Sequence, residues 1–394
     1  MTLPLPNSIV AMSEDLQAWR RDLHAHPELG YEEHRTARLV AERLRAFGLD
    51  DVEEGVGRTG VVGVLHGRSG PGGPVILLRA DMDALPITEA TGAEHASATP
   101  GVMHACGHDG HTTMLLGAAR HLAETRGFEG TVCFCFQPAE ESGAGAKAMI
   151  DDGLLARHKP RAVYGLHNWP GLPVGQMAVK EGPVLAAADE FKITLTGRGG
   201  HAAEPHLARD TLLAGAWLVT QLQTVVARLI NPRESAVISV TEFLAGHTHN
   251  VIPGTASLRG TTRCYDAGIG ETIRTEMARL AEMVAAAHGV EAMLSYGPVP
   301  YPATINDGAE ARFAHSVMKT VLGAENAHFG HPPSMASEDF SFLANEVPGA
   351  FAIIGNGETA ALHHPGYDFD DAAAPVGVAY WVRLVETALT AKPG

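Results

Sequence analysis

Apolar residues recur at helical spacing near the start of the chain. The residues that carry this spacing are Leu16, Trp19, Leu23, Leu39, Val40, Leu44 and Phe47. Because side chains three and four positions apart share one face of a helix, the pattern predicts helical structure over residues 14–47. Gly48 follows the last apolar position, where a glycine commonly ends a helix.

Short apolar runs predict buried strands further along the chain. They cover residues 74–79, 131–136, 162–166 and 350–355. Helical patterns at 111–124 and 312–322 lie between or near these runs. Strands that alternate with helices are typical of an α/β fold, in which helices cover both faces of a mostly parallel sheet.

Carboxylates or imidazoles follow each of the four predicted strands. In chain order they are Asp81 and Asp83, Glu140 and Glu141, His167 and Asn168, and, within a few residues of the last strand, His363 and His364. Open α/β sheets bind ligands at the carboxyl ends of their strands. The pattern therefore predicts one shared site at that edge of the sheet.

Residues 104–111, with the sequence HACGHDGH, form the densest cluster of metal-binding side chains. In an extended segment His104, Cys106 and His108 would share one face. A thiolate and imidazoles suit a divalent cation such as zinc, cobalt or nickel. We expect Cys106 and His108 to be ligands, whereas His104 and His111 fit either a ligand or a supporting position.

Glu140 and Glu141 fit catalytic chemistry, although an adjacent acidic pair can also be a solvated turn. Neighbouring side chains at the end of a strand diverge, so one carboxylate can bind a metal while the other faces water. Such a glutamate can take a proton from water and return it to a leaving amine. Asp81 and Asp83 fit two interpretations, a cap on the next turn or carboxylates that hold a ligand histidine or position the water.

The segment from 186 to 297 has a different order of predicted strands and helices. It predicts, in order, a strand at 190–196, a helix at 210–230, strands at 235–244 and 254–264, a helix at 271–287 and a strand at 290–296. This β-α-β-β-α-β order is typical of a ferredoxin-like fold. A chain of 394 residues also exceeds the usual size of one core. We therefore expect a discontinuous metal-binding domain at 1–185 and 298–394, with an inserted α+β domain at 186–297.

The composition limits which classes of binding partner and which cellular compartment fit this chain. A formal net charge of −16 argues against nucleic acid and anionic membranes, which require basic patches. No run approaches eighteen uninterrupted apolar residues, and the N-terminus lacks the pattern of a signal peptide. Four cysteines are too few for a disulfide scaffold in a chain of this length. These features predict a cytoplasmic protein whose Cys106 stays reduced.

The motifs together resemble a known family. DMDALP, HACGHDGH, QPAEE, LHNWP, GRGGHAAEPH, HNVIP, SEDFS and LHHP occur in the order found in the aminoacylase and carboxypeptidase family of metal-dependent amidohydrolases. The resemblance spans about residues 14 to 390. It is strongest to the branch of hippurate hydrolases, bacterial N-acyl-amino-acid amidohydrolases and plant indole-acetyl-amino-acid hydrolases.

The resemblance implies a role for individual residues of the α/β domain. The metal ligands would be Cys106, His108, Glu141, His167 and His363. They would hold one or two divalent ions, with zinc, manganese, cobalt and nickel as candidates. Glu140 would be the general base and acid, and Asp83 would orient a ligand. Asp81 stands where other branches of the family carry a metal-binding histidine, which leaves the identity of a bridging ligand open.

The resemblance also implies that the inserted domain is a lid and dimerisation domain. His201 would reach the active site of a partner subunit and polarise the substrate carbonyl, and Asn250 would lie near the substrate carboxylate. The smallest assembly would then be a homodimer.

The expected activity is hydrolysis of the amide bond of an N-acyl-L-amino acid, a small-molecule substrate. A carboxypeptidase, a dipeptidase or an N-acetyl-diaminopimelate deacetylase would use the same site with a differently shaped pocket. A non-catalytic protein with a structural metal is the remaining alternative. Five candidate ligands and a separate Glu140 argue against it, because structural zinc sites are closed by four ligands and need no base.

Overall fold

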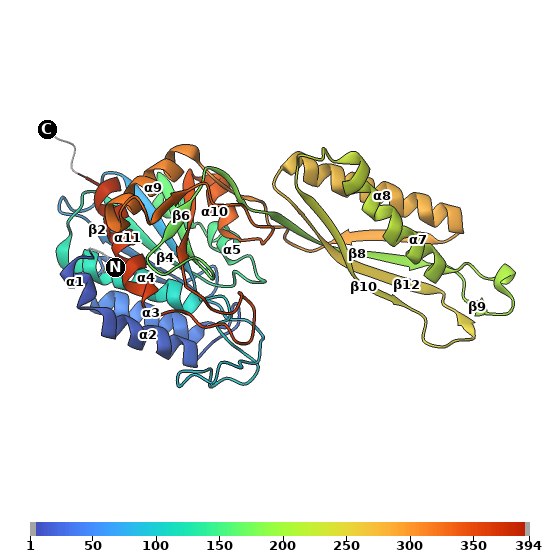
Figure 1. Ribbon diagram of the computed structural model, residues 1–394, viewed down its shortest axis with the longest axis horizontal. Coiled ribbons are helices and arrows are strands. Elements are labelled where there is room, and N and C mark those ends of the chain that lie inside the picture. Colours follow the sequence, from blue (N-terminus) through green and yellow to red (C-terminus); the bar gives the residue numbers. More distant parts are fainter. Residues whose placement is uncertain (1–4, 391–394) are drawn as a thin grey trace. The chain divides into compact units, whose positions relative to one another are not determined.

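The computed structural model describes residues 5–390. The chain divides into two compact units. Unit 1 consists of Met1–Val184, Ile305–Pro332 and Asp339–Gly394, and unit 2 of Leu185–Thr304 and Pro333–Glu338. Figure 1 shows both units and labels those of their helices and strands for which there is room.

Unit 1 is built on a mixed sheet that has eight strands within residues 5–390, in the order β1-β2-β4-β3-β5-β16-β6-β15. The four strands expected from the apolar runs are β3 (Val75–Asp81), β4 (Thr131–Gln137), β5 (Ala162–Trp169) and β16 (Gly349–Gly355). These four are neighbours and run parallel, in the order β4-β3-β5-β16. Their carboxyl ends therefore meet at one edge, and the expected α/β class is confirmed.

The other strands extend this parallel core on both sides. They are β1 (Asp51–Val56), β2 (Gly60–His66), β6 (Met177–Val179) and β15 (Ala327–Phe329). β2 joins β4 in antiparallel fashion, and β6 joins β16 in the same way. The edge pairs β1–β2 and β6–β15 were not expected from the apolar runs.

Helices pack on both faces of this sheet (Figure 1). One group of helices in mutual contact is α2 (Ser13–Ala25), α3 (His34–Ala46), α4 (His108–Thr125), α9 (Gly308–Leu322) and α11 (Ala373–Ala388). The second group is α5 (Gly145–Asp151) and α10 (Phe340–Glu346). Alternate residues of a strand face opposite sides. Accordingly Phe134 joins the core beneath the first group, while Cys135 contacts Met149 of α5.

The helical pattern at 14–47 forms two helices, not one. α2 ends at Ala25, and α3 begins at His34. Pro27 lies in the break. In the interior of a continuous helix, a proline would remove a backbone hydrogen bond. Within the break Leu29 pairs with Ala84 beyond the end of β3. This tertiary contact belongs to the connection between the two helices, which the apolar spacing did not locate.

Unit 2 has the expected β-α-β-β-α-β order. Its elements are β8 (Ala187–Thr196), α7 (Thr211–Thr224), β10 (Ala236–Ala245), β12 (Thr255–Cys264), α8 (Ala267–His288) and β13 (Glu291–Tyr296). The strands pair antiparallel in the order β10-β12-β8-β13, which is the ferredoxin-like topology. Asp210 and Asp266 accept hydrogen bonds from the first turns of α7 and α8, and so cap both helices.

α7 continues as a single π-helical turn to Leu229. Among the described residues, Thr211–Leu229 is one helix whose length and mean hydropathy of 1.3 would allow a membrane span. Core helices pass the same test, and the buried residues of α7 pack on the sheet of unit 2. Its outer face is more exposed, since Trp217 and Leu213 are 55% and 49% accessible.

Candidate active site

The predicted ligands of unit 1 come together from the ends of β4 and β5, the start of α4 and the loop that carries His363. Several groups of three have their ligand atoms within 4.8 Å of one another. Three of these groups share members: Cys106, His108 and His167; Cys106, Glu141 and His363; and His108, Glu140 and Glu141. All six residues therefore belong to one connected cluster in unit 1.

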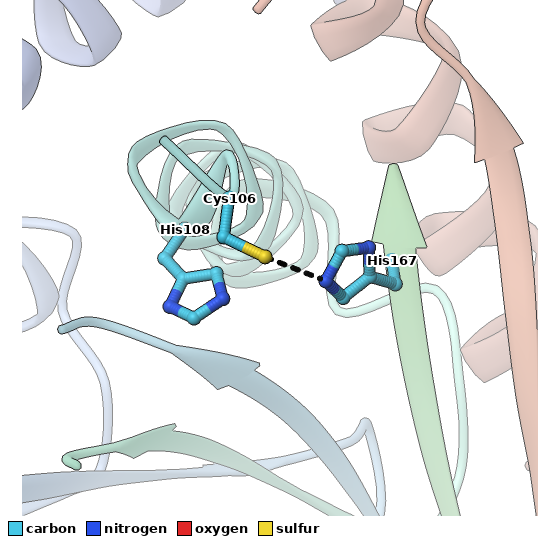
Figure 2. A group of neighbouring side chains, drawn as sticks. All are labelled: Cys106, His108 and His167. Atoms are coloured by element: carbon cyan, nitrogen blue, oxygen red, sulfur yellow. Dashed lines mark hydrogen bonds between the residues drawn. The ribbon is translucent and has the colours of Figure 1, made fainter. Parts of the chain in front are cut away.

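Cys106 and His167 approach each other across the site, next to His108 (Figure 2). The Sγ atom of Cys106 lies 3.5 Å from Nε2 of His167. Nδ1 of His167 donates to the backbone carbonyl of Asn168 at 2.7 Å, which leaves the lone pair of Nε2 facing Cys106. Burial holds the pKa of His167 well below its usual value. His167 is thus a neutral imidazole, the form that binds metals.

His108 is the first residue of α4, and its two ring nitrogens have different surroundings. Nδ1 lies 3.3 Å from Oδ1 of Asp83, whereas Nε2 is buried without a hydrogen-bond partner among the described residues. Burial opposes the charged form, but Asp81 and Asp83 outweigh it and raise the pKa of His108 to about 10. A carboxylate behind the outer nitrogen is the usual support of a metal-bound histidine.

Asp83 joins His108 to the loop that carries the two glutamates. Its second oxygen, Oδ2, accepts a hydrogen bond from the backbone N–H of Glu141 at 3.0 Å. Oε1 of Glu141 lies 3.2 Å from Nε2 of His363. His363 has a backbone φ of 64°, and its N–H donates to the carbonyl of Ala105 at 2.8 Å. Such a left-handed residue is uncommon outside glycine and often marks a functional position.

The donor set of this cluster fits a divalent cation. Within residues 5–390, Nε2 of His108 is a buried side-chain atom that forms no hydrogen bond. Burial, together with the nearby Glu141 and Glu140, raises the pKa of the Cys106 thiol well above its usual value. A bound cation would offset that negative charge, and it would give Nε2 of His108 a partner.

Glu140 lies beside the ligand cluster and is 6% exposed. Its Oε1 accepts a hydrogen bond from the backbone N–H of Asp339 at 3.3 Å. The preceding residue, Ala139, has a φ of 49°, so the backbone turns sharply just before the two glutamates. A buried carboxylate at this position can exchange a proton with a reacting group in the cluster.

A buried arginine beneath the site was missed by the sequence reasoning. Arg79 donates to Oδ2 of Asp81 at 2.7 Å, to Oδ1 of Asp339 at 2.9 Å and to Oε1 of Gln137 at 2.7 Å. It thereby ties the ends of β3 and β4 to the start of α10. A charged residue at the end of the apolar run 74–79 was the signal that could have revealed it, because a buried charge requires partners.

His104 and His111, for which the sequence left a ligand or a supporting position open, have different surroundings. Nδ1 of His111 lies 2.6 Å from Oδ1 of Asp81, and its Nε2 accepts from the backbone N–H of Asn168 at 2.9 Å. Both nitrogens therefore have hydrogen-bond partners, and His111 also forms a group of possible metal ligands with Asp81 and His108. His104 is buried, and neither of its ring nitrogens has a partner among the described residues, but it belongs to none of the ligand groups there. The extended segment ends at Gly107, because α4 begins at His108.

His201 and Asn250 lie in unit 2 and are adjacent to each other. β9 (Gly200–His201) pairs with β11 (Val251–Ile252), and the N–H of Ala202 donates to the carbonyl of Asn250 at 3.0 Å. His201 is exposed, and its Nδ1 accepts from the N–H of Ala203 at 3.0 Å. The ring proton of its neutral form is therefore on Nε2, which is then a hydrogen-bond donor.

Comparison with known proteins gives consistent matches over most of the chain. Residues 77–387 match the family described as peptidase family M20/M25/M40. A hippurate hydrolase of Campylobacter jejuni is 39% identical over 376 residues, which cover 95% of this chain and 97% of that protein. An N-acetylcysteine deacetylase of Bacillus subtilis is also 39% identical, over 93% of this chain and 94% of the relative.

A solved structure extends the similarity to the fold. It is a Bacillus subtilis protein described as a dinuclear metal-binding peptidase of the M20 family. It superimposes with a TM-score of 0.83 and is 35% identical, and the match covers 96% of this chain and 99% of that one.

Proposed function

The chain belongs to the peptidase family M20/M25/M40, and we propose that it hydrolyses the amide bond of N-acyl-L-amino acids. The products are a carboxylic acid and an amino acid, and the substrates are hippurate-like or N-acetyl compounds. The observation that carries this proposal is the buried Glu140 next to the ligand cluster of His108 and Glu141. The names of the relatives, hippurate hydrolase and N-acetylcysteine deacetylase, support the same activity.

The proposed metal centre holds one or two divalent cations, with zinc, manganese, cobalt and nickel as candidates. Its ligands are Cys106, His108, Glu141, His167 and His363. The dinuclear centre of the Bacillus subtilis structure supports the higher number. When bound, such cations supply Lewis acidity, which polarises an amide carbonyl and makes water more acidic. The thiolate among the ligands fits a reducing compartment, and we place the protein in the cytoplasm.

In unit 1, one side chain transfers the proton and another positions the metal ligands. Glu140 removes a proton from the attacking water and then donates it to the leaving nitrogen, so that the amine departs neutral. Asp83 fixes the orientation of His108 through Nδ1 and holds the backbone of Glu141. These two contacts keep the ligands in place while Glu140 changes its protonation state.

We assign the polarisation of the substrate carbonyl to His201 and the binding of the substrate carboxylate to the vicinity of Asn250. The Nε2–H of a neutral His201 is a donor suited to the oxygen that becomes negative in the transition state. Donors of this kind typically stabilise the transition state by about 3–4 kcal/mol. In our proposal His201 acts in the site of a partner subunit.

The proposal of a homodimer is supported by the surface of unit 2. The exposed face of α7 carries Trp217 and Leu213, and Leu244 of β10 is 61% exposed. β10 is an edge strand of its sheet, so its outer backbone groups are available to another strand. Exposed apolar patches beside an open sheet edge commonly form protein–protein interfaces.

A hydrolysis panel tests the proposed function. The purified protein is loaded separately with zinc, manganese, cobalt or nickel and assayed with benzoylglycine, N-acetyl-L-amino acids, N-acetyl-diaminopimelate and unblocked dipeptides. We expect benzoylglycine or an N-acetyl-L-amino acid to be cleaved with the highest kcat/KM. Preferred cleavage of a dipeptide would instead indicate a peptidase. No hydrolysis with any of the metals would contradict the proposal.

A further inference from the structure

The loop that carries Glu140 is held from below by a residue far away in the sequence. Glu33 is completely buried, and its Oε1 accepts a hydrogen bond from the backbone N–H of Ala139 at 2.8 Å. Its Oε2 accepts from the hydroxyl of Thr59 at 2.6 Å. Glu33 lies at the N-terminus of α3, so a carboxylate outside the ligand cluster reaches the backbone next to the proposed catalytic residue.

The backbone N–H of Ala139 needs a hydrogen-bond acceptor, because the residue is buried and its backbone is left-handed. Its φ of 49° is in the left-handed region, which side chains other than glycine rarely adopt. The residue is fully buried, so water cannot satisfy its N–H. A hydrogen bond from this N–H to a carboxylate satisfies the buried donor and favours the turn in which the donor faces Glu33.

The residue on the other side of Glu140 is held in the same manner. The N–H of Glu141 donates to Oδ2 of Asp83 at 3.0 Å. Two buried carboxylates thus accept hydrogen bonds from the backbone N–H groups immediately before and immediately after Glu140. Asp83 fixes the ligand Glu141, and Glu33 fixes the turn from which the side chain of Glu140 projects.

The segment between α2 and α3 adds further contacts to this loop. A Cβ atom on Gly30 would lie 3.0 Å from Cα of Ala139, so the two backbones pack closely. The hydroxyl of Tyr31 donates to the carbonyl of Gly143 at 2.6 Å. These contacts add to the hydrogen bond of Glu33 in holding the loop that carries Glu140.

From these contacts we propose that Glu33 is a positioning residue for catalysis. Its carboxylate fixes the Ala139 turn, and the turn aims Glu140 at the water and the leaving nitrogen. The inference rests on the proposed role of Glu140, because a positioned base matters only if Glu140 transfers the proton. A misplacement of about 1 Å at a reacting group can lower the rate about 100-fold.

The test compares two variants of similar size, Glu33→Gln and Glu33→Met. Glutamine keeps an oxygen that can accept from Ala139, whereas methionine fills the space without an acceptor. For hydrolysis of the best substrate in the panel, we expect Glu33→Met to lower kcat about 100-fold per metal-loaded molecule, with KM changed less than about threefold. Glu33→Gln should recover most of the lost kcat.

Thr59→Val is the matched control. It removes the second hydrogen bond of Glu33 and leaves the bond to Ala139, so kcat should stay close to that of the wild type. Metal content and thermal unfolding are measured for every variant, so that kcat is counted only for folded, loaded protein. If Glu33→Met turns over as fast as the wild type on that basis, Glu33 serves stability alone and the proposal is wrong. Equal losses of kcat in Glu33→Met and Glu33→Gln would also contradict the assigned role of the oxygen that accepts from Ala139.

Glu140→Gln, assayed in the same experiment, separates the role of Glu140 from the role of Glu33. If it retains wild-type turnover, the assigned role of Glu140 fails, and the positioning role of Glu33 fails with it. If Glu140→Gln is inactive while Glu33→Met has normal kcat, only the role of Glu33 is overturned.

Discussion

The carboxylate of Asp81 is bound to the imidazole of His111, with Oδ1 and Nδ1 only 2.6 Å apart. The other oxygen of Asp81 accepts a hydrogen bond from Arg79 at 2.7 Å. Both oxygens therefore already have strong partners. Asp81 contributes negative charge to the neighbouring His108, whose Nε2 is 3.7 Å from it, and it anchors His111 against the backbone of Asn168.

Substitution of Asp81 should weaken metal binding without removing a ligand. Asp81→Asn takes away the charge that stabilises a cation near His108 and breaks the pairing of Arg79. We expect the dissociation constant of the metal to rise about 10- to 100-fold, as for other residues that support ligands. Calorimetric titration of the metal-free protein with zinc measures this change in the dissociation constant.

Asp151→Asn is a suitable control for that titration. Asp151 forms an exposed ion pair with Lys147 on α5, and its charge is largely screened by solvent. Equal zinc affinity for Asp81→Asn and Asp151→Asn would contradict the assigned role of Asp81.

The adjacent glutamates should give opposite results when each is replaced by glutamine. Glu140→Gln removes the base but none of the proposed ligands, so metal content should be unchanged while kcat falls about 100- to 10,000-fold. Glu141→Gln removes a charged ligand, so metal is lost on dialysis and activity falls with it. Elemental analysis and kcat of the same samples separate the two cases. Loss of metal from Glu140→Gln would assign the ligand role to Glu140.

The sequence indicated which residues cluster at the proposed site better than it indicated the contacts that hold them. β3, β4 and β5 are continuous apolar runs, so their ends, and the acidic and imidazole groups there, were visible directly. Cys106 and His108 were visible because their spacing within one loop is compact. Parallel strands then bring these local signals to one edge.

The partners that position the site were not visible because they are distant in the chain. Arg79 meets Asp339 from α10, and Glu33 meets Ala139, more than one hundred residues away. No local spacing encodes such contacts. The break between α2 and α3 was missed for the same reason, since it depends on the pairing of Leu29 with Ala84.

The pH dependence of stability should reveal the buried carboxyl of Glu33. Burial raises its pKa from the ordinary value of 4.5 to about 7. The folded state therefore holds its proton more tightly than the unfolded state does. The resulting stability is complete below about pH 4.5 and is lost as the pH rises to about 7, a total of about 3 kcal/mol.

Glu33→Gln lacks this titration. Its free energy of unfolding relative to the wild type should therefore rise by about 3 kcal/mol between pH 5 and pH 8. Urea unfolding of both proteins at several pH values, in the metal-free state, provides the measurement. A difference that does not change with pH would show that Glu33 titrates normally in the folded protein.

Sharing of the active site between subunits can be tested by mixing two inactive variants. His201→Ala lacks the proposed carbonyl donor, and Glu140→Gln lacks the base. In a mixed dimer, the site with Glu140 from one chain receives His201 from the other chain. Random exchange makes half of the dimers mixed, each with one intact site of two, so about a quarter of the wild-type activity should return.

Mixing Glu140→Gln with Glu141→Gln is the matched control. Both residues lie in the same site of one chain, so no mixed dimer contains an intact site, and activity should stay at the level of the separate variants. Subunit exchange itself is followed by mass spectrometry of the intact assemblies, with one variant isotopically labelled. If exchange is complete and the His201→Ala mixture remains inactive, His201 acts within its own subunit or does not act in catalysis.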